Sequence, residues 1–284
     1  MSVQATRFTT VCTFHGEGPF WDEANARLMV VDMLAGAVVL VDADGMARRN
    51  QISTVAAAIR ARRGGGYVLA AEDRFLFLDR ELAIQRELPP AFTDPLIRMN
   101  DGGCDPQGRF YCGTMAYAET PGAGTLYRLD PDDSVHVVLR HVTISNGLQW
   151  SRNGDTAFYA DTPTGRIDRF TFDPHTGSFT ERRPFAEITG GYPDGMAIDE
   201  EDGIWVALWG GSAVHRYDDR GRLDEVISLP VSNVTACAFG GPDRRTLFIT
   251  TSRQGLAANE QPDAGAVFRF DTGIRGARQY AFAG

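Results

Sequence analysis

The chain has 284 residues, of which 28 are basic and 37 acidic, so its formal charge at pH 7 is −9. All the basic residues are arginine, which excludes chemistry that needs a lysine, such as Schiff-base aldolases, PLP enzymes and the Walker A phosphate loop. The acidity argues against a nucleic-acid partner, because binding to a phosphate backbone requires a basic face.

The composition, 43% hydrophobic and 23% charged, is typical of a globular chain. We expect one domain over residues 1–284, because all-β propellers of this length often form a single unit. The N-terminal MSVQATRFTT lacks the apolar core of a signal peptide, and the longest apolar stretch (28–41) contains Asp32 and is too short to span a bilayer. We therefore predict a cytoplasmic protein without a membrane partner, monomeric or weakly homo-oligomeric.

A strand pattern rich in β-branched and aromatic residues recurs six times. Its copies are separated by 39, 43, 47, 47 and 43 residues and begin at Arg27, Gly66, Arg109, Thr156, Gly203 and Thr246. Each copy follows a turn-rich segment such as DPQG or SRNGD, a combination typical of β-hairpins. A second strand pattern follows the copies, for example GTLYRLDPDD from Gly124.

This period predicts an all-β fold, a six-bladed β-propeller. A repeat of about 44 residues with at least two antiparallel strands, and room for four, matches one propeller blade. Residues 53–63, STVAAAIRARR, resemble a helix, but they stand where the other repeats have a strand. We predict a strand there as well, and about four antiparallel strands in every blade.

Four of the six repeats place a carboxylate or carboxamide nine or ten residues before the strand pattern. They are Glu17 in GEGP, Asn100 in RMNDG, Asn146 in ISNGL and Asp194 in YPDGM. In the second repeat the position falls on Ala56 or Ala57, and in the sixth on Ala236 or Cys237. Equivalent positions in a closed ring converge on its axis, and the neighbouring glycines suit strands that approach closely. The four polar side chains would therefore meet in the central channel.

We interpret this set as a cation site rather than as the polar lining of a wet channel. Two carboxylates at close range repel unless a cation or a proton neutralises them. An oxygen-only set of Glu, Asn and Asp is the kind that a hard divalent cation prefers. Arg98 would point into the same mouth as Asn100, because alternate residues of a strand share a face.

The remaining candidate side chains receive structural interpretations. We expect six large residues to pack within or between blades rather than to form pocket walls: Tyr111, Met115, Tyr117, Trp150, Tyr192 and Trp209. His15 is expected at the neck of the first blade, with a place near the site as the alternative. A hydrolase of the GxSxG type is not supported, because the sequence has no such motif.

Several segments together resemble the SMP-30/gluconolactonase/regucalcin-like family, in register from about residue 12 to residue 270. They are GEGPFW, RMNDGGCDPQGRFYCGTM, ISNGLQWS, YPDGMAID, WVALWGG and FGGPDRRTLFITT. WVALWGG and NVTACAFGGPD are similar to the bacterial sugar lactonases, such as xylonolactonase and arabinolactonase. The resemblance implies a six-bladed propeller with one divalent cation in its channel.

Carried over to this sequence, the resemblance implies that Glu17, Asn146 and Asp194 bind the metal and that Asp194 is also the general base. Arg98 and Asn100 would contact the substrate. In the loop AYAETPGAG, Glu119 falls one position away from a glutamate that touches substrate in some members, so it receives no role. Ca²⁺ is the first expectation for the cation, with Zn²⁺, Mn²⁺, Mg²⁺ and Fe²⁺ also open.

The predicted function is a metal-dependent lactonase, a hydrolase of carboxylic ester bonds that opens aldonolactones to aldonic acids in sugar catabolism. The cation would polarise the lactone carbonyl, and Asp194, or a metal-bound water that it deprotonates, would supply the nucleophile. Two alternatives remain open at this stage, because a fold does not decide its chemistry. One is a promiscuous phosphotriesterase or aryl-esterase at the same site, and the other is a non-catalytic calcium-binding propeller.

Overall fold

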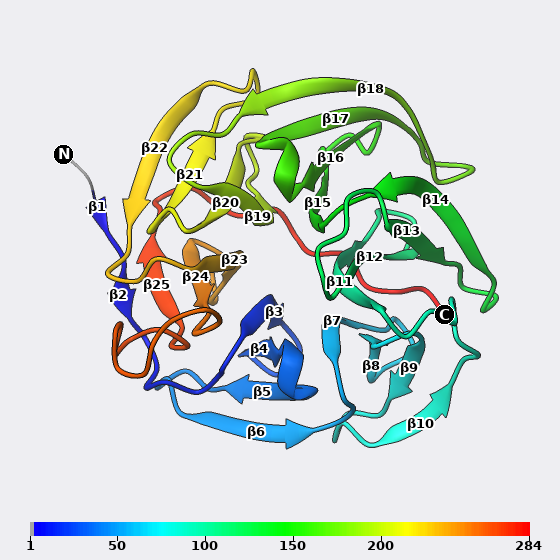
Figure 1. Ribbon diagram of the computed structural model, residues 1–284, viewed down its shortest axis with the longest axis horizontal. Helices are drawn as coiled ribbons and strands as arrows, with labels where there is room; N and C mark the ends of the chain where they lie inside the picture. Colours follow the sequence, from blue (N-terminus) through cyan, green and yellow to red (C-terminus); the bar gives the residue numbers. More distant parts are fainter. Residues whose placement is uncertain (1–2) are drawn as a thin grey trace.

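The computed structural model describes residues 3–284 and forms six β-sheets arranged as blades around a central axis (Figure 1). Five sheets have four strands and one has five, and all pairs are antiparallel except one. Residues 3–284 contain two short 3-10 turns and no α-helix. No helix in this part of the chain is long and apolar enough to cross a membrane. The predicted six-bladed propeller with four antiparallel strands per blade is confirmed.

The blades follow chain order, and in each the first strand is innermost (Figure 1). Blades 1 to 3 are β3 (Gly16–Asp22), β4 (Arg27–Asp32), β5 (Ala37–Val41), β6 (Ala47–Gln51); β7 (Ala56–Ala61), β8 (Tyr67–Ala71), β9 (Phe75–Leu78), β10 (Ile84–Glu87); and β11 (Ile97–Cys104), β12 (Phe110–Ala116), β13 (Gly124–Leu129), β14 (Val135–Val142). Blades 4 to 6 are β15 (Ser145–Trp150), β16 (Thr156–Asp161), β17 (Arg166–Asp173), β18 (Ser178–Glu187); β19 (Tyr192–Ile198), β20 (Ile204–Trp209), β21 (Ala213–Tyr217), β22 (Leu223–Ser228); and β23 (Val234–Gly240), β24 (Thr246–Thr251), β25 (Phe268–Asp271).

The N-terminal segment closes the ring. Strand β2 (Thr6–Arg7) supplies the outermost strand of blade 6 by antiparallel pairing with β25. Strand β1 (Val3–Gln4) adds a fifth strand to blade 5 by parallel pairing with β22. The two ends of the repeated region are therefore joined by backbone hydrogen bonds, which complete the four strands of the last blade.

The repeated sequence patterns correspond to fixed positions in the blades. The six copies that begin at Arg27 and its equivalents form the second strands, and the pattern that follows them forms the third strands. The helix-like segment 53–63 contains β7, as predicted, and Ala56 to Ile59 are fully buried within it. Tertiary packing between blades therefore overrides the helix propensity of the alanine run.

All six inner strands carry a bulge at the same place. Opposite β4, the register of β3 jumps from Glu17 to Phe20. Equivalent breaks follow Ala56, Met99, Asn146, Pro193 and Val234. A bulge bends the strand and changes the direction of a side chain. The residues at these breaks that share one position are Glu17, Ala57, Asn100, Asn146, Asp194 and Thr235.

The predicted position in the sixth repeat is wrong. Thr235 occupies the break, whereas Ala236 already pairs with Thr250 and Cys237 with Ile249. Thr235 lies eleven residues before Thr246, outside the spacing of nine or ten that located the other positions. Its hydroxyl donates to Gly16 O at 2.6 Å, so it joins blade 6 to blade 1 rather than facing the cavity.

Glycine is required where the inner strands meet. A Cβ on Gly147, at φ +33°, would lie 2.7 Å from Asp194 O. A Cβ on Gly195 would lie 2.4 Å from the Cβ of Ala236. Strands β15, β19 and β23 therefore approach one another almost backbone to backbone, which places Asn146 and Asp194 on adjacent strands at the axis.

The C-terminal segment crosses the face of the ring opposite the starts of the inner strands (Figure 1, red). It hydrogen-bonds successively to blade 5 (Ala277 N to Ile198 O, 3.0 Å) and to blade 2 (Phe282 N to Ala61 O, 2.9 Å). Phe282 is fully buried between the turns it contacts. The segment therefore links two opposite blades across that end of the channel.

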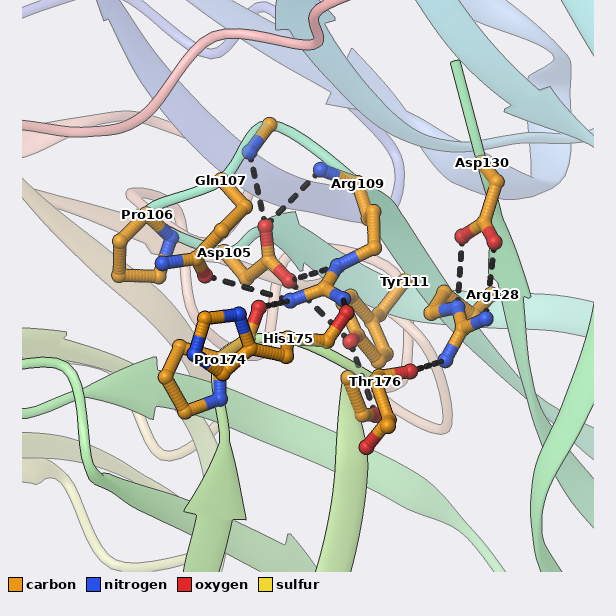
Figure 2. Close-up of polar contacts among 12 residues, drawn as sticks. Asp105, Pro106, Gln107, Arg109, Tyr111, Arg128, Asp130, Pro174, His175 and Thr176 are labelled. Carbon is orange, nitrogen blue, oxygen red and sulfur yellow. Dashed lines mark hydrogen bonds and ion pairs between the residues drawn. The ribbon is translucent and has the colours of Figure 1, made fainter. Parts of the chain in front are cut away.

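A polar network on the same side joins blade 3 to blade 4 (Figure 2). Arg109 pairs with the buried Asp105 and donates to Pro174 O and His175 O, in the turn between β17 and β18. The nearby Arg128 guanidinium and Tyr111 hydroxyl donate to the same turn. Gly177, at φ +68°, lies against both side chains, and a Cβ there would be 2.6 Å from the Tyr111 hydroxyl oxygen.

We expect Gly177→Ala to lower the free energy of unfolding by more than the backbone strain alone. Gly273→Ala is the matched control, because its φ is +67° and no atom lies within 4 Å of the new Cβ. The control should lose about 1–2 kcal/mol from the left-handed backbone, and Gly177→Ala about 1–3 kcal/mol more from overpacking. Denaturant unfolding measures both changes. Equal losses of unfolding free energy in the two variants would show that the turn is not tightly packed against blade 3.

Candidate active site in the central channel

A cavity of about 370 Å³ opens among the starts of the inner strands. Its lining includes all five predicted site residues, which are Glu17, Arg98, Asn100, Asn146 and Asp194. Each is at most 5% exposed. They come from four different blades, so the closed ring brings together side chains that are far apart in sequence.

Two carboxyl groups in this cavity have strongly raised pKa values. Burial, together with the neighbouring Asp101, raises the pKa of Glu17 to about 8. Burial, Glu17 and Asp101 raise the pKa of Asp194 well above its ordinary range. Glu17 Oε2 accepts a hydrogen bond from Gly18 N at 3.1 Å. Among the described residues, Asp194 Oδ1 is the one side-chain oxygen that is both inaccessible to solvent and without a hydrogen-bond partner.

A chain of hydrogen bonds orients the two amides. Asn100 accepts from the Arg98 guanidinium at 2.6 Å and donates to Ser145 O at 2.9 Å. Arginine only donates and a carbonyl only accepts, so both ends of the Asn100 amide are determined. Its Nδ2 also donates to Asn146 Oδ1 at 2.9 Å, and Asn146 Nδ2 donates to Thr162. Asn146 Oδ1 keeps one lone pair free.

Arg98 is a buried cation whose Nη1 donates to Asn100 Oδ1 and to Met99 O and also contacts Met33 Sδ. Its Nη2 has a weaker partner, Met115 Sδ at 3.1 Å. Burial lowers the pKa of Arg98, whereas Tyr117 and the carboxylates of Glu17 and Asp194 raise it. Arginine stays charged at any ordinary pH, so the site keeps one fixed positive charge.

Sequence reasoning missed Asp101. Its Oδ1 accepts from Gly102 N at 2.7 Å, and burial raises its pKa while Arg60 lowers it. It raises the pKa values of Glu17 and Asp194, although it does not line the cavity. The sequence feature that could have indicated it is the pair of adjacent polar residues, Asn100 and Asp101. Both lie in one bulge, opposite Gly113.

The large side chains divide into two groups. Tyr111 and Trp150 are buried in a core cluster, as predicted. Met115, Tyr192 and Trp209 line the cavity, so for these three the expected packing within or between blades is wrong and the alternative, a role as pocket walls, is confirmed. All three lie at or next to the strand end that faces the channel. There the side chains of a strand stop packing in the core and begin to line the cavity. Tyr117 packs its ring 5.8 Å from the Arg98 guanidinium.

His15 and Glu119 also line the cavity. The alternative for His15 is thus confirmed, because the residue lies beside the site rather than at the neck of blade 1. Burial and Arg98 lower its pKa to about 3, although Asp32 raises it, so the imidazole is neutral. Glu119 sits at φ +53° in the short loop after β12, a strained backbone position that turns the loop over the cavity.

The oxygens of Glu17, Asn146 and Asp194 fit a hard divalent cation. One of them has no partner, one has a free lone pair, and the two carboxylates repel without a positive charge between them. Residues 3–284 contain no group of three or more His, Cys, Asp or Glu side chains suited to a metal. A cation here would therefore take two carboxylates, one amide oxygen and water.

The sequence and fold match known proteins along their whole length. The model of the SMP-30/gluconolactonase/LRE-like region matches residues 15–253. The chain is 35% identical over 277 residues to "Putative sugar lactone lactonase YvrE" of Bacillus subtilis, covering 95% of each protein. It is also 35% identical to regucalcin of Gallus gallus, again over 95% of both. The structure of a calcium-binding regucalcin from Agrobacterium tumefaciens superposes with a TM-score of 0.90 at 27% identity, covering 100% of this chain and 99% of that one.

The raised pKa of Glu17 predicts a pH-dependent stability in chelator-treated protein. Since the folded state holds a proton that the unfolded state releases near pH 4.5, the free energy of unfolding should fall as pH rises from 4.5 to about 8. Glu17→Gln removes this titration and should make the dependence shallower, leaving the part due to Asp194. Denaturant unfolding of both proteins between pH 5 and 8 measures it, and identical slopes would contradict the assignment.

Proposed function

The chain belongs to the SMP-30/gluconolactonase/LRE-like family, and on this basis we propose that it is a metal-dependent lactonase. It hydrolyses sugar lactones to aldonic acids and so acts on a carboxylic ester bond. The observation that carries the proposal is one open cavity in which two buried carboxylates, an oriented amide and a buried arginine converge. The name of the Bacillus relative, a sugar lactone lactonase, supports the same substrate class.

Glu17, Asn146 and Asp194 would hold the cation. Ca²⁺ is the first candidate, since the ligands are all oxygen and the Agrobacterium protein is described as calcium-binding. When bound, the cation supplies the positive charge that polarises the lactone carbonyl and stabilises the negative charge developing on its oxygen.

Arg98 and Asn100 would orient the substrate. The Arg98 guanidinium contacts two methionine sulfurs, which are poor acceptors that a sugar hydroxyl displaces easily. Asn100 has no free hydrogen-bond donor for the substrate, because its Nδ2 hydrogens are donated to Ser145 O and Asn146 Oδ1. It retains one lone pair on Oδ1 for a substrate hydroxyl. Its larger role is to position Arg98 and Asn146.

Asp194 is the proposed general base. Its carboxylate lines the cavity and would take a proton from the attacking water as the water oxygen bonds to the carbonyl carbon. The ester bond to the ring oxygen then breaks, and the same proton passes to that oxygen, which becomes the hydroxyl of the open acid. Arg98 keeps its charge throughout, so the proton transfers fall to the carboxylate.

We expect Asp194→Asn to lower kcat by about 10²–10⁴-fold, the usual contribution of a positioned general base. The melting temperature without added cation should not fall, because the neutral amide removes the repulsion with Glu17. Asp219→Asn, in an exposed turn, is the matched control and should keep full turnover. Retention of most activity in Asp194→Asn would remove its assigned role.

The proposal as a whole is tested by a panel of lactones crossed with a panel of cations, read by acid release. Glucono-, xylono- and arabinono-lactones should be hydrolysed with at least one of Ca²⁺, Zn²⁺, Mn²⁺, Mg²⁺ or Fe²⁺, and a chelator should abolish the reaction. A higher kcat/KM on paraoxon or an aryl ester would favour the esterase alternative. Cation binding without hydrolysis above the blank would favour a non-catalytic propeller.

A further inference from the structure

A second polar wall faces Arg98 across the cavity. Arg98 belongs to blade 3, whereas His15 precedes blade 1, Trp209 ends the second strand of blade 5 and Gln254 follows the second strand of blade 6. Blades 3 and 6 are opposite in a ring of six (Figure 1). The proposed reaction assigns no task to this wall, although His15 is only 5% exposed.

The hydrogen bonds of His15 determine which ring nitrogen carries the proton. His15 Nδ1 lies 2.8 Å from the hydroxyl oxygen of Ser252, which also accepts from Gln254 N at 3.0 Å. Ser252 is fully buried, and no other acceptor for its hydroxyl hydrogen exists in the described part of the chain. The hydroxyl must therefore donate to Nδ1, which leaves the hydrogen on Nε2.

The Nε2–H has no partner among residues 3–284, so it is a donor available to a ligand in the cavity. The backbone holds the ring in place, because His15 N donates to Asp32 Oδ1 at 2.9 Å and its ring meets Trp209 edge-on at 6.1 Å. The Gln254 side-chain amide is also without a partner in this region, while the backbone carbonyl of Gln254 accepts from Asn233 Nδ2. The wall thus combines a rigid donor, an amide and an indole.

We propose that His15, together with Trp209 and Gln254, forms a subsite for the hydroxyl groups of the substrate that lie away from the scissile carbonyl. His15 is then a specificity-determining residue that favours polyhydroxylated lactones over unsubstituted ones. The inference rests on the proposed lactonase function. A lactone without hydroxyls would offer the Nε2–H no acceptor, so it would lose a hydrogen bond that a polyhydroxylated lactone makes.

The test compares two six-membered lactones, glucono-δ-lactone and δ-valerolactone, which differ in their hydroxyl groups. The measured quantity is the ratio of their kcat/KM values on the cation-loaded protein. His15→Phe keeps a ring of similar size without the donor, and it should lower this ratio at least about tenfold. His15→Gln restores an N–H donor and should recover part of the ratio. Ser252→Ala removes the hydrogen bond that keeps the His15 proton on Nε2. It should lower the ratio by a smaller factor.

A ratio within twofold of the wild-type value in folded His15→Phe would overturn the inference and leave the lactonase proposal standing. If His15→Phe does not fold by circular dichroism, an unchanged ratio in Ser252→Ala has the same force. If the wild-type protein hydrolyses neither lactone, the proposed function fails by itself. The subsite is then tested by measuring the affinity for gluconate and for 5-hydroxypentanoate by calorimetry. The inference requires that His15→Phe weaken the binding of gluconate but not that of 5-hydroxypentanoate.

Discussion

Crowding at the axis of the ring is the constraint on which the rest of the structure depends. Six strands converge there, and residues such as Gly147 and Gly195 leave no room for a Cβ. The same strands all bulge at one level, which bends each strand beside the position that faces the axis. Where the side chain at that position is a carboxylate or a carboxamide it lines the cavity, and where it is Ala57 or Thr235 it does not.

Close approach also creates the electrostatic character of the site. Glu17 and Asp194 are brought together without hydrogen bonds sufficient for two buried charges, and Asp101 adds a third carboxylate. Arg98 opposes this charge but is itself committed to Asn100. The C-terminal segment runs across the far end of the channel, where it hydrogen-bonds to blades 5 and 2. The repulsion between these carboxylates would therefore favour the binding of a cation.

Most of the fold followed from local sequence signals. Hydrophobic strand patterns at a regular spacing predicted six blades, because each blade repeats the same hairpins and turns. The same spacing located Glu17, Asn100, Asn146 and Asp194. It failed at Thr235, where the sixth repeat departs by one residue, and spacing alone did not reveal Asp101. The closing strands β1 and β2 were not predicted, since two-residue strands carry no periodicity.

The sequence by itself determined the architecture and the four polar positions at the axis, because strand alternation and repeat length are local properties of the chain. Only the tertiary structure decided which neighbours those positions have. The hydrogen bond from Ser252 to His15, the cavity side of Trp209 and the partnerless oxygen of Asp194 depend on contacts between different blades. Such contacts follow from ring closure and from bulges that shift the register by single residues, and neither leaves a periodic trace in the sequence.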